Sequence, residues 1–391
     1  MAEDTRTATS AGANAAQGAL PRRGVFWRFA ARSLKLNRSR TIVSIIGIAL
    51  SCALITAIFT SVATLYEGLL KAEIVTEGAW QVELVNVPED EIDVVHADPR
   101  VTRSYDRITY GDAIMPKSFE GYWGRYLSVQ EWPTADKVKG LKPLPHIAEG
   151  RAPQAPDEIV LTHKLKGLTV ENGSWLYDSL PTTGRDDDVP RAAWDGGLEI
   201  GSVIDLALGE RTFVDAESGQ EAPCLYDESL YTTESATGDV ISEYLANPGE
   251  LKSYKVVGFY APEGIRKDDV WGRTGPGHLG FVSSPEVPVR TTSIYLTTNL
   301  KSRTEIDGLI EDYTGNPHAI FNGGGNRDDI ENMEGQTAAY SHDSLMRYQG
   351  MTDDRSIWGT LYTLAFILSA VVIGASISLI YNSFAIAVSE R

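Results

Sequence analysis

The fold of this chain is decided by residues 41–66, TIVSIIGIALSCALITAIFTSVATLY, which are 26 in number and carry no charge. An α-helix rises about 1.5 Å per residue, so this run is long enough to cross a bilayer core of roughly 30 Å. A second uncharged run, SIWGTLYTLAFILSAVVIGASISLIYNSFAIAVS, follows at 356–389. We therefore expect two transmembrane helices, at 41–66 and 356–384. The first run is too long for the apolar part of a cleaved signal peptide, which favours a retained anchor.

The charges beside these runs predict how the chain is oriented. Residues 22–40 hold seven Arg and Lys residues and no acid, which is typical of a cytoplasmic flank. The segment 67–355 holds 50 of the 53 acidic residues but only 26 of the 35 basic ones. We expect a multi-pass protein of the plasma membrane, with a cytoplasmic N-terminus and an extracellular central domain at 67–355.

Overall composition excludes several classes of protein. The 391 residues are 42% hydrophobic and 23% charged, which fits a folded chain and not a wholly disordered one. A formal net charge of -18 argues against nucleic-acid binding, because phosphates would be repelled. The two cysteines, Cys52 and Cys224, are too few for a disulfide framework or a multi-cysteine zinc site.

The residues before the first apolar run divide into two parts. Residues 1–24 are mostly small and polar, which predicts a disordered cytoplasmic tail. Residues 25–40 interleave aromatic and basic side chains at helical spacing, which predicts an amphipathic helix in the lipid headgroup layer. A plain basic flank is the alternative. The predicted membrane-surface contacts are Arg28, Arg32, Lys35, Arg38 and Arg40.

Both apolar runs contain small residues at four-residue spacing. Gly47 and Ser51 follow this spacing in the first run, and Ala370, Gly374 and Ser378 follow it in the second. Small side chains let helix backbones approach closely in lipid, so these five are candidate packing residues. The alternative is that they reflect the ordinary composition of membrane helices.

The central segment alternates short β-branched and aromatic runs with turn residues, which predicts a mixed α/β domain. The fold class is thus an α+β membrane protein. Polar stretches near 171–199 and 210–250 are expected to be insertions or long loops. Strands are predicted at 80–85, 102–115, 122–129, 158–162, 203–208, 254–260 and 293–298. Helices are predicted at 302–313, with Thr304 or Ser302 as the cap, and at 341–348.

The sequence lacks the common motifs of catalytic, metal-binding and nucleotide-binding sites. The six histidines show no metal-binding spacing, and neither a nucleophile elbow nor a phosphate-binding Walker loop occurs. Asp186, Asp187 and Asp188 are consecutive, unlike the alternating acids of a calcium loop, and predict a solvated acidic loop. We expect no catalytic residue, no metal and no cofactor in this chain.

Several motifs along the chain together form a recognisable pattern. The motifs are FWRFAARSLKLNRSRTIVSIIGIAL at 26–50, IAEGRAP at 147–153 with DEIVL at 157–161, LEIGSVI at 198–204, YKVVGFY at 254–260 and IYNSFAIAVSER at 380–391. In this order and spacing they resemble the motifs of FtsX-like, MacB-type ABC transporter permeases, and the motifs at the two membrane ends are the most specific.

The resemblance implies a central domain of the MacB periplasmic-core type and a permease without ATPase activity of its own. A separate cytoplasmic ABC ATPase would dock on the segment 385–391, at Ser389, Glu390 and Arg391. The permease would pair with a second copy or a homologous permease and export or extract peptides, lipids or lipoproteins. Family members have further spans beyond this point, so the chain is expected to be a fragment or a truncated product.

Two other functional classes stay open. A two-span receptor or sensor would bind a ligand or partner through its ectodomain without transport. A surface hydrolase is a weaker hypothesis, because no nucleophile and base cluster is visible in the sequence.

Overall fold

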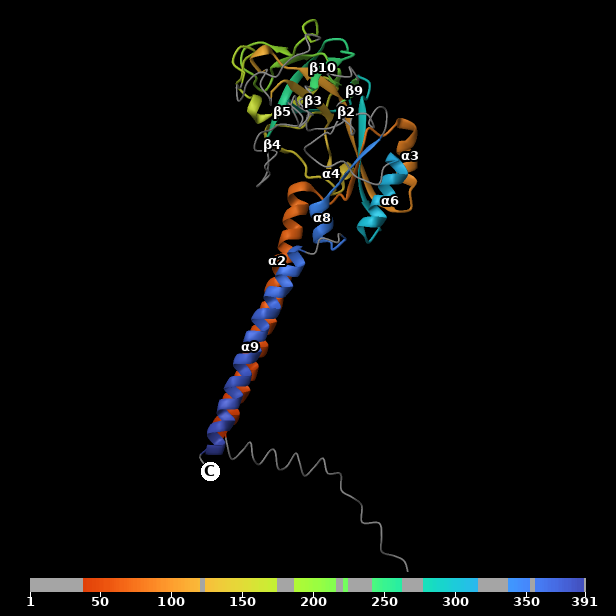
Figure 1. Cartoon of the computed structure of the whole chain (residues 1–391). Helices are drawn as coiled ribbons and strands as arrows, with labels where there is room; N and C mark the ends of the chain where they lie inside the picture. Colours follow the sequence, from red (N-terminus) through yellow and green to blue (C-terminus); the bar gives the residue numbers. More distant parts are fainter. Residues whose placement is uncertain are drawn as a thin grey trace, which may run out of the picture. The chain divides into compact units, whose positions relative to one another are not determined.

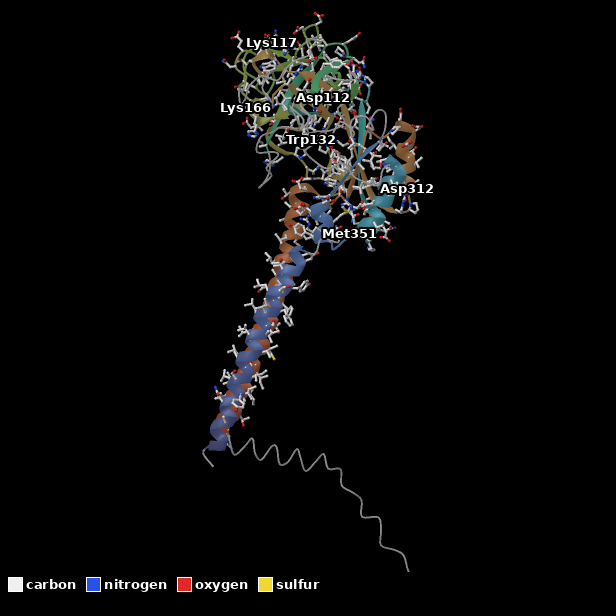
Figure 2. All side chains as sticks on the ribbon, in the orientation of Figure 1. Asp112, Lys117, Trp132, Lys166, Asp312 and Met351 are labelled. Atoms are coloured by element: carbon white, nitrogen blue, oxygen red, sulfur yellow. The ribbon has the colours of Figure 1, made fainter. Side chains whose placement is uncertain are left out.

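The computed structural model describes residues 38–119, 124–173, 186–215, 221–223, 241–261, 277–315, 337–351 and 356–389. The chain divides into two compact units. One unit is formed by the two ends, Met1–Leu65 and Ser356–Arg391, and the other, here called the sheet domain, by Tyr66–Arg355. Figure 1 shows the elements of both units coloured along the sequence, and Figure 2 adds the side chains.

The first unit contains the long apolar helix α9 (Ser356–Ser389) and the part of the long helix α2 (Arg38–Glu77) up to Leu65. α2 contains the first uncharged run and continues beyond it, and α9 covers the second. The stretches Thr41–Glu77 and Gly359–Asn382 are long and apolar enough to cross a membrane. Most of their large apolar side chains are exposed in the single chain, which suits lipid better than water.

The two helices run antiparallel and side by side (Figure 1). Ala365 and Ser369 are buried residues of α9. The hydroxyl of Ser376 contacts that of Ser51, which in turn donates a hydrogen bond of 2.7 Å to the carbonyl of Gly47. Small side chains at this contact allow the two backbones to come close together.

The sheet domain contains a mixed sheet of 11 strands among its described residues, in the order β14-β1-β13-β2-β3-β12-β5-β11-β7-β6, with β4 also paired to β11. β11 runs parallel to β5 and β12 runs parallel to β3, whereas the other neighbours are antiparallel. The strands are β1 (Val82–Val85), β2 (Val101–Ile114), β3 (Tyr126–Glu131), β4 (His146–Gly150), β5 (Glu158–Thr162), β6 (Ala193–Trp194), β7 (Val203–Leu206), β11 (Lys252–Ala261), β12 (Gly277–Val282), β13 (Thr291–Thr298) and β14 (Ala338–Ser341).

Short helices and a second, three-stranded sheet complete the domain. The small sheet has the order β10-β8-β9. Its strands are β8 (Glu210–Asp215), β9 (Glu221–Pro223) and β10 (Ile241–Ala246). The helices are α3 (Glu89–Ala97), α4 (Ala135–Val138), α6 (Arg303–Thr314) and α8 (Asp343–Tyr348), with single 3-10 turns at Lys117–Phe119 and His163–Leu165.

The long strand β2 passes through two hydrophobic cores. Its first part pairs with β13 and its last part with β3. In the core beside β13, Val95 of α3 and Ile306 of α6 pack with Leu84 and Ile294 of the sheet. The core beside β3 gathers fully buried side chains from strands far apart in sequence, such as Leu127, Ile159 and Phe259.

A buried ion pair joins the large sheet to the small one. Asp186 contacts Arg125, and both side chains are 3% exposed. The second carboxylate oxygen of Asp186 accepts a hydrogen bond of 2.8 Å from the backbone N–H of Leu245 in β10. The expectation of a solvated loop is therefore wrong for Asp186 and holds for Asp187 and Asp188, which are exposed. Burial of Asp186 is possible because a charged partner and an N–H both bind it.

The structure confirms a mixed α/β domain between two long apolar helices. β5 has the predicted bounds, and of the two predicted caps of α6 the structure has Ser302, whose hydroxyl accepts from the N–H of Glu305. The interpretation of 210–250 as a long loop is wrong, because three strands lie there, and its interpretation as an insertion stays a prediction. α3 is absent from the prediction because its sequence, EDEIDVVHA, is rich in acids and poor in large apolar residues.

Candidate functional site

The segments that connect the sheet domain to the apolar helices are bonded to each other on neighbouring strands. β1 follows α2 after the link 78–81, and β14 leads directly into α8. β1 and β14 pair antiparallel, with Val82 opposite Ser341. The N–H of His342 donates to the carbonyl of Gln81 at 2.9 Å. The side chains around this point form the junction cluster, which we define as Glu73, Trp80, Gln81, Lys142, Tyr295 and His342.

A glycine makes the turn from α2 into the link. Gly78 has a φ of +103°, a conformation that L side chains rarely adopt. A Cβ built on it would lie 2.0 Å from the carbonyl oxygen of Leu141. The next residue, Ala79, donates its N–H to the carbonyl of Gly140 at 3.3 Å. The end of α2 is therefore held close to the turn that follows α4.

Gln81 binds three parts of the domain with one side-chain amide. Its Oε1 accepts from the backbone N–H of Thr298 at 2.7 Å and from the hydroxyl of the same residue at 2.9 Å. Its Nε2 donates to Oε1 of Gln349 at 2.8 Å and to Sδ of Met351 at 3.3 Å. Gln81 is 6% exposed, so these bonds are shielded from water and hold β1, the end of β13 and the segment after α8 together.

An aromatic layer lies beside Gln81. The rings of Trp80 and Tyr295 meet edge to face with centroids 5.4 Å apart, and Trp80 donates from Nε1 to the carbonyl of Glu77 at 2.9 Å. The ammonium of Lys142 lies 4.8 Å from the Tyr295 ring centroid and 5.3 Å from that of Trp80. Arg107 donates to the Tyr295 hydroxyl at 2.9 Å. Cation–π contacts of this kind hold the rings in a defined orientation.

His342 is the buried titratable group of the junction cluster. Its ring stacks on Trp80 with centroids 4.5 Å apart and an interplanar angle of 20°. Nδ1 lies 3.0 Å from the carbonyl oxygen of Trp80, and Nε2 lies 3.1 Å from Oε1 of Glu73. Burial lowers the pKa of His342, while the Trp80 carbonyl and Glu73 act in the opposite direction and Lys142 adds to the lowering.

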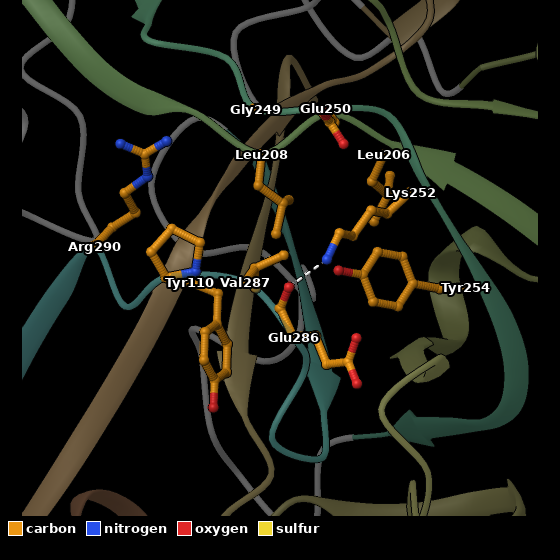
Figure 3. A pocket seen from close by; sticks show the side chains of 11 residues that line it. Tyr110, Leu206, Leu208, Gly249, Glu250, Lys252, Tyr254, Glu286, Val287 and Arg290 are labelled. Atoms are coloured by element: carbon orange, nitrogen blue, oxygen red, sulfur yellow. Dashed lines mark hydrogen bonds between the residues drawn. The ribbon is translucent and has the colours of Figure 1, made fainter.

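A pocket of about 200 Å³ lies elsewhere in the sheet domain, between β2, β7 and β11 (Figure 3). Its walls include Tyr110, Leu208 and Tyr254. Acidic and basic side chains both reach it, and two of its polar groups already have protein partners. Lys252 donates to the carbonyl of Glu286, and Arg290 donates to a loop carbonyl at 2.9 Å. This lining selects neither an anion nor a cation, so it does not define a ligand.

The predicted surface and ATPase contacts lie at or beyond the edges of the described chain. Arg38 is the exposed first residue of α2, Arg40 lies in its first turn, and Ser389 is the last residue of α9. The other predicted contacts fall outside the described residues, and their roles stay predictions. They are Arg28, Arg32, Lys35, Glu390 and Arg391.

The predicted packing residues fall on two different faces. Gly47 and Ser51 are half-buried on the side of α2 that meets α9. Ala370, Gly374 and Ser378 are exposed in the single chain, and a Cβ on Gly374 would meet no atom within 4 Å. Packing of these three against another helix stays a prediction.

No protein-family model and no curated protein matches this chain. Within the described ranges, no three His, Cys, Asp or Glu side chains gather as they would around a metal ion. The resemblance to FtsX-like permeases therefore stays a prediction carried by the quoted motifs.

The junction cluster is absent from the sequence-based prediction. Its members come from parts of the chain as distant as Glu73 and His342, which are 269 positions apart. The one local signal is Gly78 directly after the last residue of α2, a position where glycine is common. Local periodicity does not show which distant residues will meet, so the cluster is visible only in the tertiary structure.

Proposed function

We propose that this chain is a permease subunit of an ABC transporter and works with a separate cytoplasmic ATPase. In this proposal α2 and α9 cross the plasma membrane, the N-terminus is cytoplasmic, and the sheet domain is an extracellular domain of the MacB periplasmic-core type. Nucleotide binding by the partner displaces the helices, and the helices move the sheet domain. The work done outside is export or extraction of peptides, lipids or lipoproteins.

The observation that supports this proposal best is the bonding of β1 to β14 at the junction cluster. A displacement of the segment after α2 acts on β1, and backbone pairing passes it directly to β14. Gln81 extends the same connection to β13 and to Met351. A mechanical link needs this stiffness, because a flexible linker would absorb the displacement before it reached the sheet.

The membrane part of the proposal is supported by the helices and the charges. Both helices pass the length and hydropathy requirement for a span. The basic residues before the first run and the acidic composition of the central segment favour a cytoplasmic N-terminus and an external sheet domain. Protease treatment of intact cells tests this directly. We expect cleavage within the sheet domain, and recovery of an uncut chain in the soluble fraction would overturn the proposal.

The ATPase part of the proposal is tested by co-purification. We expect the full-length gene product, extracted in mild detergent, to bring down a protein that binds and hydrolyses ATP. Arg391→Glu reverses the charge of the predicted docking segment and should abolish this association. Arg100→Glu, in the sheet domain, is the matched charge reversal that should leave it unchanged.

The coupling between nucleotide binding by the ATPase and the sheet domain is measured separately, on the purified complex. Gln81→Leu should keep the ATPase bound but abolish the nucleotide-dependent change in hydrogen exchange of β13 and β14. Failure to recover any ATPase with the unaltered chain would overturn the permease proposal, and the two-span receptor would then be the better hypothesis.

A further inference from the structure

Both ring nitrogens of His342 face hydrogen-bond acceptors. Nδ1 is 3.0 Å from the carbonyl oxygen of Trp80, and Nε2 is 3.1 Å from a carboxylate oxygen of Glu73. A neutral imidazole carries one N–H and one lone pair. It can therefore donate to only one of the two acceptors, and the other contact needs an additional proton.

The added proton belongs between His342 and Glu73. The carbonyl of Trp80 and an ionised Glu73 carboxylate both only accept, so in a neutral imidazole one ring nitrogen points its lone pair at an acceptor. The carbonyl belongs to the backbone and cannot turn away, so we place the hydrogen on Nδ1, and the lone pair of Nε2 then points at the carboxylate. Without another proton these two atoms repel each other. When the additional proton is present, an imidazolium faces a carboxylate or an imidazole faces a carboxylic acid. In either arrangement the two side chains share the proton in one hydrogen bond.

The surroundings hold the pKa of His342 below its ordinary value. The groups facing His342 are Glu73 of α2, Lys142 after α4, and the carbonyl and ring of Trp80. The neighbouring Asp343 bonds to Arg303 and Ser341. Burial and Lys142 oppose a positive ring, and together they outweigh Glu73 and the carbonyl. The pair of His342 and Glu73 therefore takes up its proton at a lower pH than a free histidine does.

Glu73 is the side that can move. Its side chain is 22% exposed, whereas that of His342 is 7% exposed and stacked on Trp80. A carboxylate that loses its bond to Nε2 can turn into water at little cost, while the imidazole stays in place. The bond between α2 and the turn after β14 is thus made or broken by one proton.

We propose that a proton shared by Glu73 and His342 is a latch that fastens the last turns of α2 to the β14–α8 turn, closed when the proton is bound and open when it leaves. The latch joins the two chain segments that lead to the apolar helices. It does not rest on the proposed transport function, because it needs no ATPase and no substrate.

The substitution Glu73→Gln separates the contact itself from the proton that it needs. A glutamine amide supplies an N–H to the lone pair of Nε2 without any added proton, so this variant should be closed at every pH. Glu73→Leu removes the partner and should be open at every pH. The surface pair His96 and Asp106, 2.9 Å apart, is the matched control, because Asp106→Asn alters a histidine–carboxylate contact outside the cluster.

The experiment uses the full chain in phosphatidylcholine nanodiscs at about pH 4 and about pH 8, because the pKa of His342 lies below the ordinary histidine value. Nitrogen NMR of labelled histidines, assigned with His342→Gln, reports the protonation of each ring nitrogen. Hydrogen exchange of residues 66–81 and 337–351, corrected for the intrinsic pH dependence, reports closure. We expect roughly tenfold slower exchange or more at the lower pH in the unaltered chain and in Asp106→Asn.

We expect Glu73→Gln to exchange slowly at both pH values and Glu73→Leu to exchange fast at both. The latch would be overturned by pH-independent exchange in the unaltered chain, or by the same pH response in Glu73→Leu. It would also be overturned if Nε2 of His342 stayed unprotonated and without a hydrogen bond at the lower pH. Recovery of an ATPase has no bearing on these outcomes, so the two proposals fail separately.

Discussion

The side-chain amides of Gln81 and Gln349 share a hydrogen bond of 2.8 Å across 268 positions of the chain. Gln81 follows α2, and Gln349 follows α8 on the way to α9. The bond therefore ties together the two points at which the chain enters and leaves the sheet. Because Gln81 is buried and also accepts from Thr298, loss of its amide would leave several polar groups without partners.

Replacement of Gln81 by Leu should destabilise the sheet domain by about 2–4 kcal/mol, because the buried N–H of Thr298 loses its acceptor and the amide bonds vanish. Urea unfolding of the full chain in detergent, followed by far-UV circular dichroism, measures this change. Gln349→Ala is the control. Gln349 is exposed, so water replaces the lost bond and the expected cost is below about 1 kcal/mol.

A methyl group at Gly78 should be costly. Gly78→Ala forces an L side chain into a φ of +103° and places its Cβ 2.0 Å from the Leu141 oxygen, so we expect a loss of about 2 kcal/mol or more. Gly140→Ala separates the two causes. Gly140 also has a positive φ, but no atom lies within 4 Å of its Cβ position, so only the conformational cost of about 1 kcal/mol should appear. Equal losses for the two variants would show that close packing at Gly78 contributes nothing.

Removal of Asp186 should be among the most damaging single changes in the domain. Asp186→Ala leaves the positive charge of Arg125 buried and the N–H of Leu245 without an acceptor, with an expected cost of about 3–5 kcal/mol. Asp187→Ala alters an exposed neighbour and should change stability by less than about 0.5 kcal/mol. Thermal unfolding of the two variants side by side measures the difference. Similar melting temperatures would contradict the burial of Asp186.

The ion pair of Asp98 and Arg100 predicts a loss of stability in acid. Hydrogen bonding to Arg100 lowers the pKa of Asp98 from 3.8 to about 2. A lowered carboxyl pKa stabilises the fold above the unfolded value, and that contribution disappears as the pH falls from about 4 towards 2. We expect a loss of about 1–2 kcal/mol, since Arg100 is one third exposed and water screens the pair. Asp98→Asn should flatten the stability curve over this range, and an unchanged curve would contradict the pairing.

The contact of Ser51 with Ser376 predicts a specific cross-link between the apolar helices. In a chain whose native Cys52 and Cys224 are replaced by Ala, the pair Ser51→Cys and Ser376→Cys should form a disulfide readily within one chain. The pair Ser51→Cys and Gly374→Cys is the control and should not, because Gly374 is exposed on another face of α9. Non-reducing electrophoresis separates the products. Equal cross-linking of both pairs would contradict the antiparallel register.

Local sequence patterns were enough for those parts of the fold that depend on nearest neighbours. β5 matches its predicted bounds, because Glu158–Thr162 is a β-branched run set off by turn residues. The cap at Ser302 was predictable for the same reason, since capping needs only residues three positions apart. The strands within 210–250 were not predictable, because their polar sequence forms strands only through pairing between β8, β9 and β10.

The sequence alone determined that the two runs 41–66 and 356–389 would be uncharged and apolar, because charge and hydrophobicity are properties of each residue and need no partner. It also determined that an acidic, mixed α/β segment would lie between them. Only the tertiary structure decided that Gln81 meets Gln349 and that His342 lies against Glu73. These contacts exist because β1 pairs with β14, and that pairing depends on the packing of the entire sheet rather than on any local stretch.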